Sequence, residues 1–186
     1  MISCGAFSGP ERGIAERLVG VEIPSLVLDD CMRSSLDLAM FARACPIVLY
    51  LFPGCSGSPE GEEQVAVMDV VQHRAFRDLL PEFEARGSTP IGVSSQAEQD
   101  QRYASHANRL AHRLLCDPEL RLAHALELPT FSCDGADWYQ RLTLVVDEGC
   151  IVKVFYPIAS AWNSAAQVLA WLMLHSRAPD GGNDAG

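Results

Sequence analysis

The sequence predicts an α/β protein with a mixed central sheet and helices on both faces of that sheet. Three observations support this prediction. Short apolar runs of strand length alternate with stretches of helical period, and the most apolar run covers residues 46–52. Near the C-terminus, residues 141–147 and 151–155 form two strand patterns joined by a glycine-containing turn, which is typical of a hairpin. The order β-α-β-α-β-α-β-β-α therefore predicts a three-layer α/β/α sandwich.

The remaining elements follow from local signals along the chain. We expect further strands at residues 25–28, 89–94 and 112–116, and helices over residues 34–43, 70–86, 96–110, 117–127 and 161–176. Pro81 should kink its helix or begin a second one, because proline removes a helical hydrogen bond. Asp117 and Pro118 are typical of a helix start with a cap and a proline at the first position. Residues 46–52 are apolar throughout, as in a central strand covered on both faces.

Length and composition predict one domain with two short flanking segments. The 186 residues suffice for a self-sufficient core, and we place the domain at residues 22–177. Residues 1–21 contain several glycines and are interpreted as an N-terminal extension outside the core. Residues 178–186 have the composition of a disordered tail.

Charge and targeting signals narrow the possible partners. The formal net charge is -10, which disfavours nucleic acid and anionic membranes as partners. No apolar run reaches the roughly 18 residues that a membrane span needs, and residues 1–20 lack the pattern of a secretory signal. We therefore expect a cytoplasmic protein without a membrane partner.

Cysteine and histidine spacing predicts neither a disulfide framework nor a metal centre. The seven cysteines are an odd number without CxxC spacing. His106, His112 and His124 show no metal-ligand spacing. We expect no metal and no other cofactor.

The stretch from residue 46 to residue 78 is the first candidate for function. A buried strand is expected to lead into the loop Pro-Gly-Cys-Ser-Gly-Ser-Pro-Glu, which holds Cys55, and then into a helix. In α/β proteins such strand-to-helix loops lie at the carboxyl edge of the sheet, where active sites gather.

Several strings in the chain resemble peroxiredoxins of the alkyl hydroperoxide reductase and bacterioferritin-comigratory branch. They are Val-Leu-Tyr-Leu-Phe-Pro at 48–53, Phe-Arg-Asp at 76–78, Ile-Gly-Val-Ser-Ser at 91–95, Leu-Leu-Cys-Asp-Pro-Glu at 114–119, and the hairpin segment 141–157. The resemblance covers roughly residues 22–173. It implies a thioredoxin-like fold, a cysteine that reduces hydroperoxides, a thiol reductant protein as electron donor, and a plausible homodimer.

The sequence departs from the peroxiredoxin pattern at the catalytic cysteine. The family places this cysteine in Pro-x-x-x-Thr/Ser-x-x-Cys, but counting from Pro53 gives Gly57 and Glu60 at the threonine and cysteine positions. Counting back from Phe-Arg-Asp at 76–78 gives Asp69 at the position of the peroxidatic cysteine and Arg74 at a common resolving position. The motif is therefore broken.

The resemblance still suggests candidate site residues. Arg141, in Arg-x-Thr-x-x-x-Asp with Thr143 and Asp147, matches the arginine that orients the peroxide. Cys55 is the candidate nucleophile, although it could equally be an ordinary loop thiol. Cys133, in an expected loop before the Arg141 strand, is the candidate resolving thiol.

Asp69 and His73 form a second constellation. They lie four residues apart and so share one face of a helix, where they could perform acid–base chemistry beside Arg141. The alternative is a solvated helix start, in which an acidic residue is favoured by the helix dipole.

Three hypotheses for function follow. The first is a thiol peroxidase or related oxidoreductase that reduces hydroperoxides through Cys55. The second is a peroxiredoxin-fold protein whose Asp69, His73 and Arg141 pocket performs cysteine-independent acid–base chemistry or binds a small molecule. The third is a non-catalytic dimeric binding protein in which Arg141 forms a structural ion pair.

Overall fold

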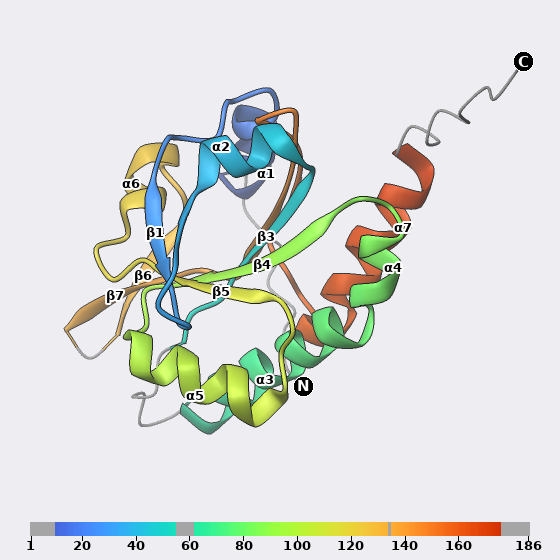
Figure 1. The fold of residues 1–186 in the computed structure, drawn as a ribbon. Coiled ribbons are helices and arrows are strands. Elements are labelled where there is room, and N and C mark those ends of the chain that lie inside the picture. The colour runs from blue at the N-terminus through green and yellow to red at the C-terminus, as the bar shows by residue number, and fades with distance from the viewer. Residues whose placement is uncertain (1–9, 55–61, 134, 176–186) are drawn as a thin grey trace, which may run out of the picture.

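The computed structural model describes residues 10–54, 62–133 and 135–175. Within these ranges, seven strands form one mixed sheet in the order β2-β1-β5-β4-β3-β8-β9 (Figure 1). The strands are β1 (Val27–Asp30), β2 (Ser35–Asp37), β3 (Ile47–Leu51), β4 (Thr89–Ser94), β5 (Arg113–Cys116), β8 (Leu142–Asp147) and β9 (Cys150–Phe155). The mixed sheet predicted from the sequence is confirmed: β3 is parallel to β4 and antiparallel to β8.

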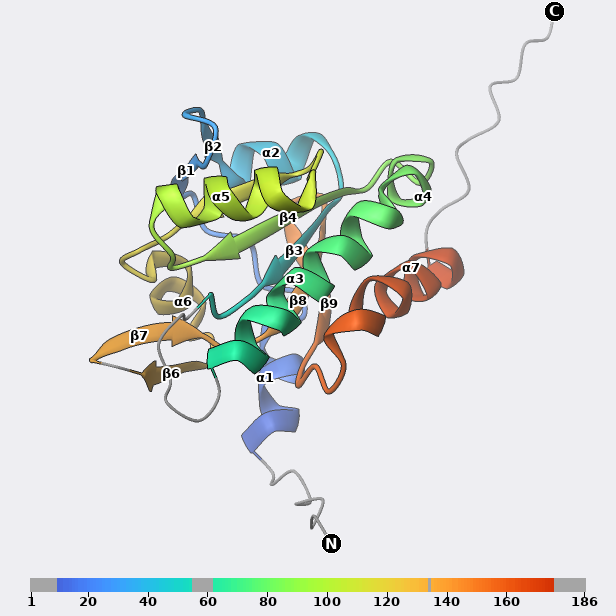
Figure 2. The ribbon, with the colours of Figure 1, turned by 90° about the horizontal axis from the view of Figure 1, so that it is seen from below.

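Helices cover both faces of this sheet, so the three-layer arrangement is also confirmed (Figures 1 and 2). One layer contains α1 (Pro10–Leu18), α2 (Leu38–Ala44) and α6 (Arg121–Leu126). The opposite layer contains α3 (Glu62–Asp78), α4 (Leu80–Glu84), α5 (Glu98–Asn108), the 3₁₀ helix η1 (Ala161–Asn163) and α7 (Ser164–His175). Pro81 lies in the first turn of α4, so the proline begins a second helix after α3, as one of the two predicted outcomes.

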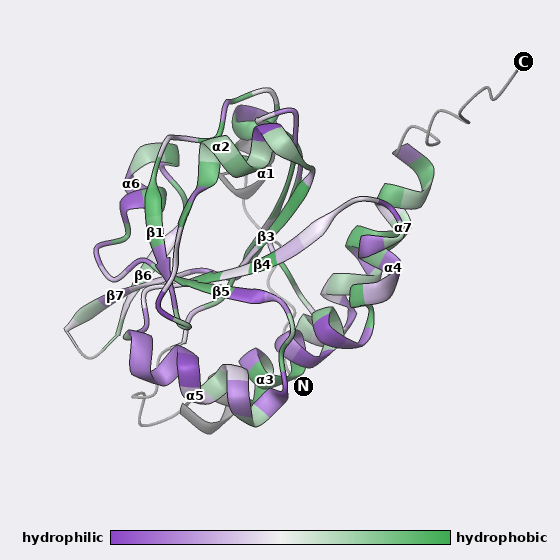
Figure 3. Cartoon of the chain, viewed as in Figure 1, coloured by the Kyte–Doolittle hydropathy of each residue, from purple (hydrophilic) through white to green (hydrophobic). Residues whose placement is uncertain are grey.

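Strand β3 divides the core into two clusters because its side chains alternate between the two faces. Ile47, Leu49 and Leu51 pack with α1, α2 and α6. Tyr50, together with Phe52, faces α3 and the opposite layer. Every residue of β3 is buried, as expected for a central strand. Figure 3 shows hydrophobic colour along β3, whereas α5 is largely hydrophilic.

Several details differ from the sequence-based expectations. Residues 35–37 form strand β2 rather than the start of the helix expected over residues 34–43, and that helix, α2, begins at Leu38. Leu18 of α1 is buried in the core, so residues 10–18 do not lie outside it; the domain boundary at residue 21 stays a prediction. Helix α6 begins at Arg121 rather than at residue 117, because Leu120 adopts a left-handed conformation (φ 51°) that ends the preceding turn. A separate two-stranded sheet, β6 (Thr130–Cys133) with β7 (Ala136–Tyr139), occupies a stretch expected to be a loop.

Candidate functional site

One face of α3 carries the polar residues of the site. Asp69, Gln72 and His73 follow the i, i+3, i+4 spacing that places side chains on one helix face, and all three are buried. Phe76, one turn further, is also buried on this face and anchors it against the sheet. A buried polar face needs partners, since an unpaired polar group away from water is costly.

Asp69 finds its partners at the end of β3 and before β8. Its Oδ2 accepts a hydrogen bond from the Gly54 amide at 2.9 Å, and its Oδ1 lies 2.6 Å from Nη2 of Arg141. Burial raises the pKa of the Asp69 carboxyl, while the Arg141 charge and the two hydrogen bonds lower it and offset part of this effect. The resemblance assigns Asp69 to the position of the peroxidatic cysteine and Arg141 to the position of the peroxide-orienting arginine. The carboxylate of Asp69 is bound to this arginine.

Gly54 is held in a conformation that favours glycine. Its φ is +72°, and a Cβ at this position would collide with the side chains of Gln96 and Ser94. Its amide donates to Asp69, and its carbonyl accepts from Nε2 of Gln96 at 2.7 Å. The backbone after β3 is thereby fixed to both α3 and the segment before α5.

Arg141 is shared between two residues of α3. Besides Asp69, its Nη1 donates to Oε1 of Gln72. The Nε2 of Gln72 and the hydroxyl of Thr143 are buried without a hydrogen-bond partner among the described residues. Thr143 pairs with Tyr50 in the sheet register, so the Arg-x-Thr string places its threonine on the strand next to the site.

His73 connects the helix face to the sheet. Its Nδ1 lies 3.0 Å from the hydroxyl of Tyr50, and that hydroxyl lies 2.7 Å from Nε2 of His112. Burial lowers the pKa of His73 to about 3 and that of His112 to about 4, so both imidazoles are neutral at pH 7. The His73 ring also makes an edge contact with Phe52, with centroids 4.5 Å apart.

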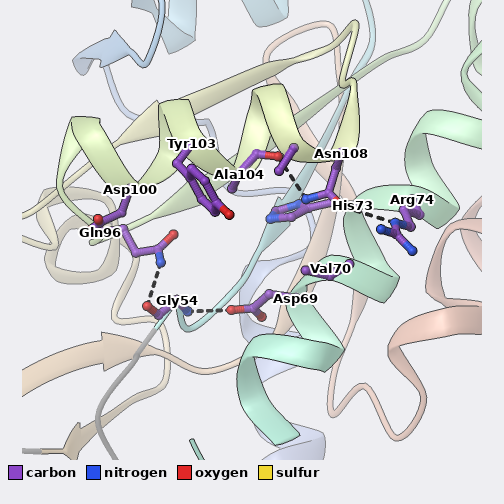
Figure 4. A pocket seen from close by; sticks show the side chains of 11 residues that line it. Gly54, Asp69, Val70, His73, Arg74, Gln96, Asp100, Tyr103, Ala104 and Asn108 are labelled. Atoms are coloured by element: carbon purple, nitrogen blue, oxygen red, sulfur yellow. Dashed lines mark hydrogen bonds between the residues drawn. The ribbon is translucent and has the colours of Figure 1, made fainter. Parts of the chain in front are cut away.

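A pocket of about 390 Å³ opens between α3 and α5, and Asp69 and His73 both line it (Figure 4). Its walls are joined by Arg74, whose Nε donates to Oδ1 of Asn108 at 3.1 Å. The complete lining comprises Gly54, Asp69, Val70, His73, Arg74, Gln96, Asp100, Tyr103, Ala104, Ala107 and Asn108. Arg141 is absent from this lining and reaches the pocket only through Asp69.

The structure brings some of the predicted site residues together and leaves others elsewhere. Asp69 and Arg141 are in direct contact, and His73 lies one turn along α3 from Asp69. Cys55 and Glu60 lie outside the described residues. Cys133 lies in β6 rather than in a loop, because its backbone pairs with Ala136 of β7. It does not line the pocket.

Sequence reasoning missed three residues of the site: Gln72, Tyr50 and His112. Gln72 could have been found from the helical spacing, since it lies three residues after Asp69 on the same face. Tyr50 and His112 carry no comparable signal, because their contact joins positions 62 residues apart.

Among the described residues, no group of three or more histidine, cysteine, aspartate or glutamate side chains is placed to hold a metal ion. The described helices include none that is long and apolar enough to cross a membrane.

Comparison with known structures defines the class of the fold. The crystal structure of the peroxidoxin BcpB from Mycobacterium tuberculosis superimposes with a TM-score of 0.72 at 21% identity, covering 86% of this chain and 98% of that one. The bacterioferritin comigratory protein of Xanthomonas campestris, studied for alkyl peroxide reduction, gives 0.70 at 23% identity, with coverage of 86% and 99%. Reduced Prx3 from Vibrio vulnificus, solved with hydrogen peroxide, gives 0.70 at 19% identity, with coverage of 86% and 98%.

These likenesses establish a thioredoxin-like peroxiredoxin fold, as the resemblance implied. A comparison with curated proteins finds no match. The AhpC/TSA family model matches residues 19–155, so the chain belongs to the AhpC/TSA family.

Proposed function

We propose that this AhpC/TSA-family protein binds a small polar molecule in the pocket between α3 and α5 and acts on it without a cysteine. This proposal rests on one observation: Arg141 and the Gly54 amide both bind the carboxylate of Asp69. The guanidinium that would otherwise orient a peroxide is already paired with Asp69 and Gln72.

The residues that line the pocket support acid–base chemistry on a small ligand. His73 is neutral at pH 7, and its Nε2, which no hydrogen bond joins to a described residue, can donate to an acceptor oxygen of a ligand. Asp69 contributes a carboxylate whose pKa burial has raised. Arg74 lines the pocket from α3, and its guanidinium can donate to a carbonyl or carboxylate oxygen, while Asp100 lines it from α5. Arg141 acts through Asp69, as a positioning residue.

A binding screen tests this proposal. The full chain is titrated with pyruvate, acetate and cumene hydroperoxide, and binding is followed by ¹H–¹⁵N correlation spectra. We expect shifts at pocket residues with pyruvate or acetate, loss of these shifts in Asp69→Asn, and their retention in Cys55→Ser. Glu82→Gln, an exposed acid on α4, is the matched control.

The outcomes separate the alternatives. Binding that survives Asp69→Asn would contradict the assignment of the pocket. Absence of binding with all three probes would instead favour the non-catalytic role, in which the ion pair between Arg141 and Asp69 is purely structural.

Membership of the AhpC/TSA family favours a second candidate, a thiol peroxidase that uses Cys55. Cys55 directly follows Gly54, whose amide contacts Asp69. In this reaction the Cys55 thiolate attacks one peroxide oxygen, the O–O bond breaks, and an alcohol or water leaves as Cys55 becomes a sulfenic acid. A second thiol, with Cys133 as the candidate, would condense with it to a disulfide and release water. A reductant dithiol would then reduce this disulfide to two thiols and itself become a disulfide.

Hydroperoxide consumption distinguishes this candidate from the first. The peroxidase predicts consumption of cumene hydroperoxide and labelling of Cys55 by a dimedone-type probe, both lost in Cys55→Ser. Cys133→Ser should slow turnover but leave the labelling of Cys55. Full activity in Cys55→Ser would eliminate a cysteine mechanism at this position.

A further inference from the structure

Three buried side chains form a hydrogen-bonded chain that runs over one face of the sheet and ends at the pocket. It runs from His112, before β5, through Tyr50 on β3 to His73 on α3. The Tyr50 hydroxyl lies within 3.0 Å of a nitrogen of each histidine, and all three residues are buried. His73 is the member that lines the pocket (Figure 4).

The strand between these residues leaves space for the chain. Strand β4 lies between β3 and β5, and its Gly92 pairs with Tyr50 on one side and Leu114 on the other. A Cβ at Gly92 would lie 2.8 Å from the Tyr50 hydroxyl and 2.5 Å from the Leu114 side chain. The absence of this atom allows the tyrosine ring to pass over β4 to His112. The same ring stacks on Phe76, with centroids 4.2 Å apart.

The single hydroxyl proton of Tyr50 allows two directions for the chain. Either Tyr50 donates to His73 and accepts from His112, or the reverse. Nδ1 of His112 is buried without a partner among the described residues. If Tyr50 donated to His112, that Nδ1 would carry a buried N–H with no acceptor. If Tyr50 accepts from His112, Nδ1 keeps only a lone pair, and buried donors without partners are the rarer case.

We propose that His112 and Tyr50 fix His73 in the tautomer with its proton on Nε2, so that the pocket presents a neutral imidazole N–H to an acceptor oxygen of the ligand. Tyr50 donates to Nδ1 of His73, which leaves the His73 proton on Nε2, and no hydrogen bond joins Nε2 to a described residue. The ligand class is then a molecule with a carbonyl or carboxylate oxygen. The ligand part of this inference rests on the proposed function; the tautomer does not.

Nitrogen-15 NMR of the histidine rings in the full chain tests the tautomer without any ligand. Two-bond ¹H–¹⁵N ring correlations distinguish a protonated ring nitrogen from a bare one. We expect both His73 and His112 to carry the proton on Nε2 at pH 7. Protons on Nδ1 in both rings would reverse the donor and acceptor roles in both hydrogen bonds and overturn the proposal. This measurement needs no variant and is independent of whether any probe binds.

Tyr50→Phe tests the role of the hydroxyl as a positioning group. The ring and its stacking on Phe76 remain, but Nδ1 of His73 loses its donor. We expect the ¹⁵N signal of that nitrogen to shift and pyruvate affinity to fall about tenfold, the loss of one hydrogen bond of roughly 1.4 kcal/mol. An unchanged His73 signal would contradict the proposed hydrogen bond from Tyr50 to His73.

Tyr139→Phe is the matched control, because Tyr139 is also fully buried and its hydroxyl donates to Asp117 at 2.5 Å on the opposite face of the sheet. This variant should lose stability without moving the His73 signals. If pyruvate affinity stays constant in Tyr50→Phe while the tautomer is as expected, the ligand part fails alone and the tautomer stands.

Discussion

The two faces of the sheet use the same strands for different purposes. On the face covered by α1, α2 and α6, Leu49 lies in a cluster that is aliphatic apart from Tyr139, whose hydroxyl donates to the buried carboxylate of Asp117. On the face covered by α3, the next residue of β3, Tyr50, bonds to two buried histidines, and Asp69 pairs with Arg141. Replacing buried polar groups with well-packed apolar ones is often neutral or stabilising. The first face therefore provides stability, and the second retains polar groups that stability alone does not require.

The largest effect should come from breaking the buried ion pair. Asp69→Ala leaves Arg141 charged in a site where its side chain is only 13% exposed. We expect a loss of about 3–5 kcal/mol in the free energy of unfolding, measured by urea denaturation. The double variant Asp69→Leu, Arg141→Met should recover most of this loss and bind no pyruvate. A double variant as unstable as Asp69→Ala would show that the pair itself is needed for folding.

A truncation on the apolar face should be nearly as destabilising but functionally silent. Leu49→Ala removes a fully buried side chain and leaves a cavity, at an expected cost of about 2–5 kcal/mol. The ring signals of His73 and its response to pyruvate should remain as in the wild type. Altered His73 signals in Leu49→Ala would mean that the two faces are coupled through β3.

Adding one methyl group at Gly92, next to the tyrosine that joins the two histidines, should disturb only the face covered by α3. Gly92→Ala places a Cβ against Tyr50 and Leu114, and such overpacking costs about 1–3 kcal/mol. We expect the hydrogen bond between Tyr50 and His112 to lengthen, seen as a changed His112 ring signal. Gly13→Ala, in α1, controls for the change from glycine to alanine, because an added Cβ there would meet nothing within 4 Å and its φ, like that of Gly92, is not positive.

The last prediction is a pH dependence of stability from the buried histidines. Their folded pKa values, about 3 and about 4, lie below the unfolded value near 6.5. Between these values the unfolded state binds more protons, so stability falls as pH decreases, by up to about 1.4 kcal/mol per histidine per pH unit. Asp69, whose pKa is raised, opposes this in the lower part of the range because the folded state binds its proton first.

Urea denaturation at pH 7.0, 6.0 and 5.0 measures this slope. His124→Gln, at an exposed position on α6, should leave it unchanged. A flat profile between pH 6 and 5 would contradict neutral burial of His73 and His112.

Local patterns predicted the fold better than they predicted the site. Strand β4 occupies the predicted residues 89–94, and the C-terminal hairpin formed as its glycine-containing turn indicated. Both partners of the Asp69–Arg141 ion pair were predicted from the resemblance, Asp69 by counting back along α3 and Arg141 from the string that begins just before β8. The hairpin of β6 and β7 escaped prediction because its strands are short and half-exposed, with little apolar alternation.

The contact between Tyr50 and His112 depends on strand order and on a missing Cβ at Gly92, neither of which a local pattern contains. From the sequence, His112 is a strand residue with no metal-ligand spacing, although its ring is part of the buried chain. Distant contacts of this kind depend on topology, which the sequence specifies only through the whole fold.

The grouping of Asp69, Gln72, His73 and Phe76 on one face of α3 has a consequence for how this protein can change. A single deletion between Asp69 and Phe76 would rotate part of the face by about 100°, since a helical turn contains 3.6 residues. The spacing within these two turns of α3 is therefore inherited whole or lost.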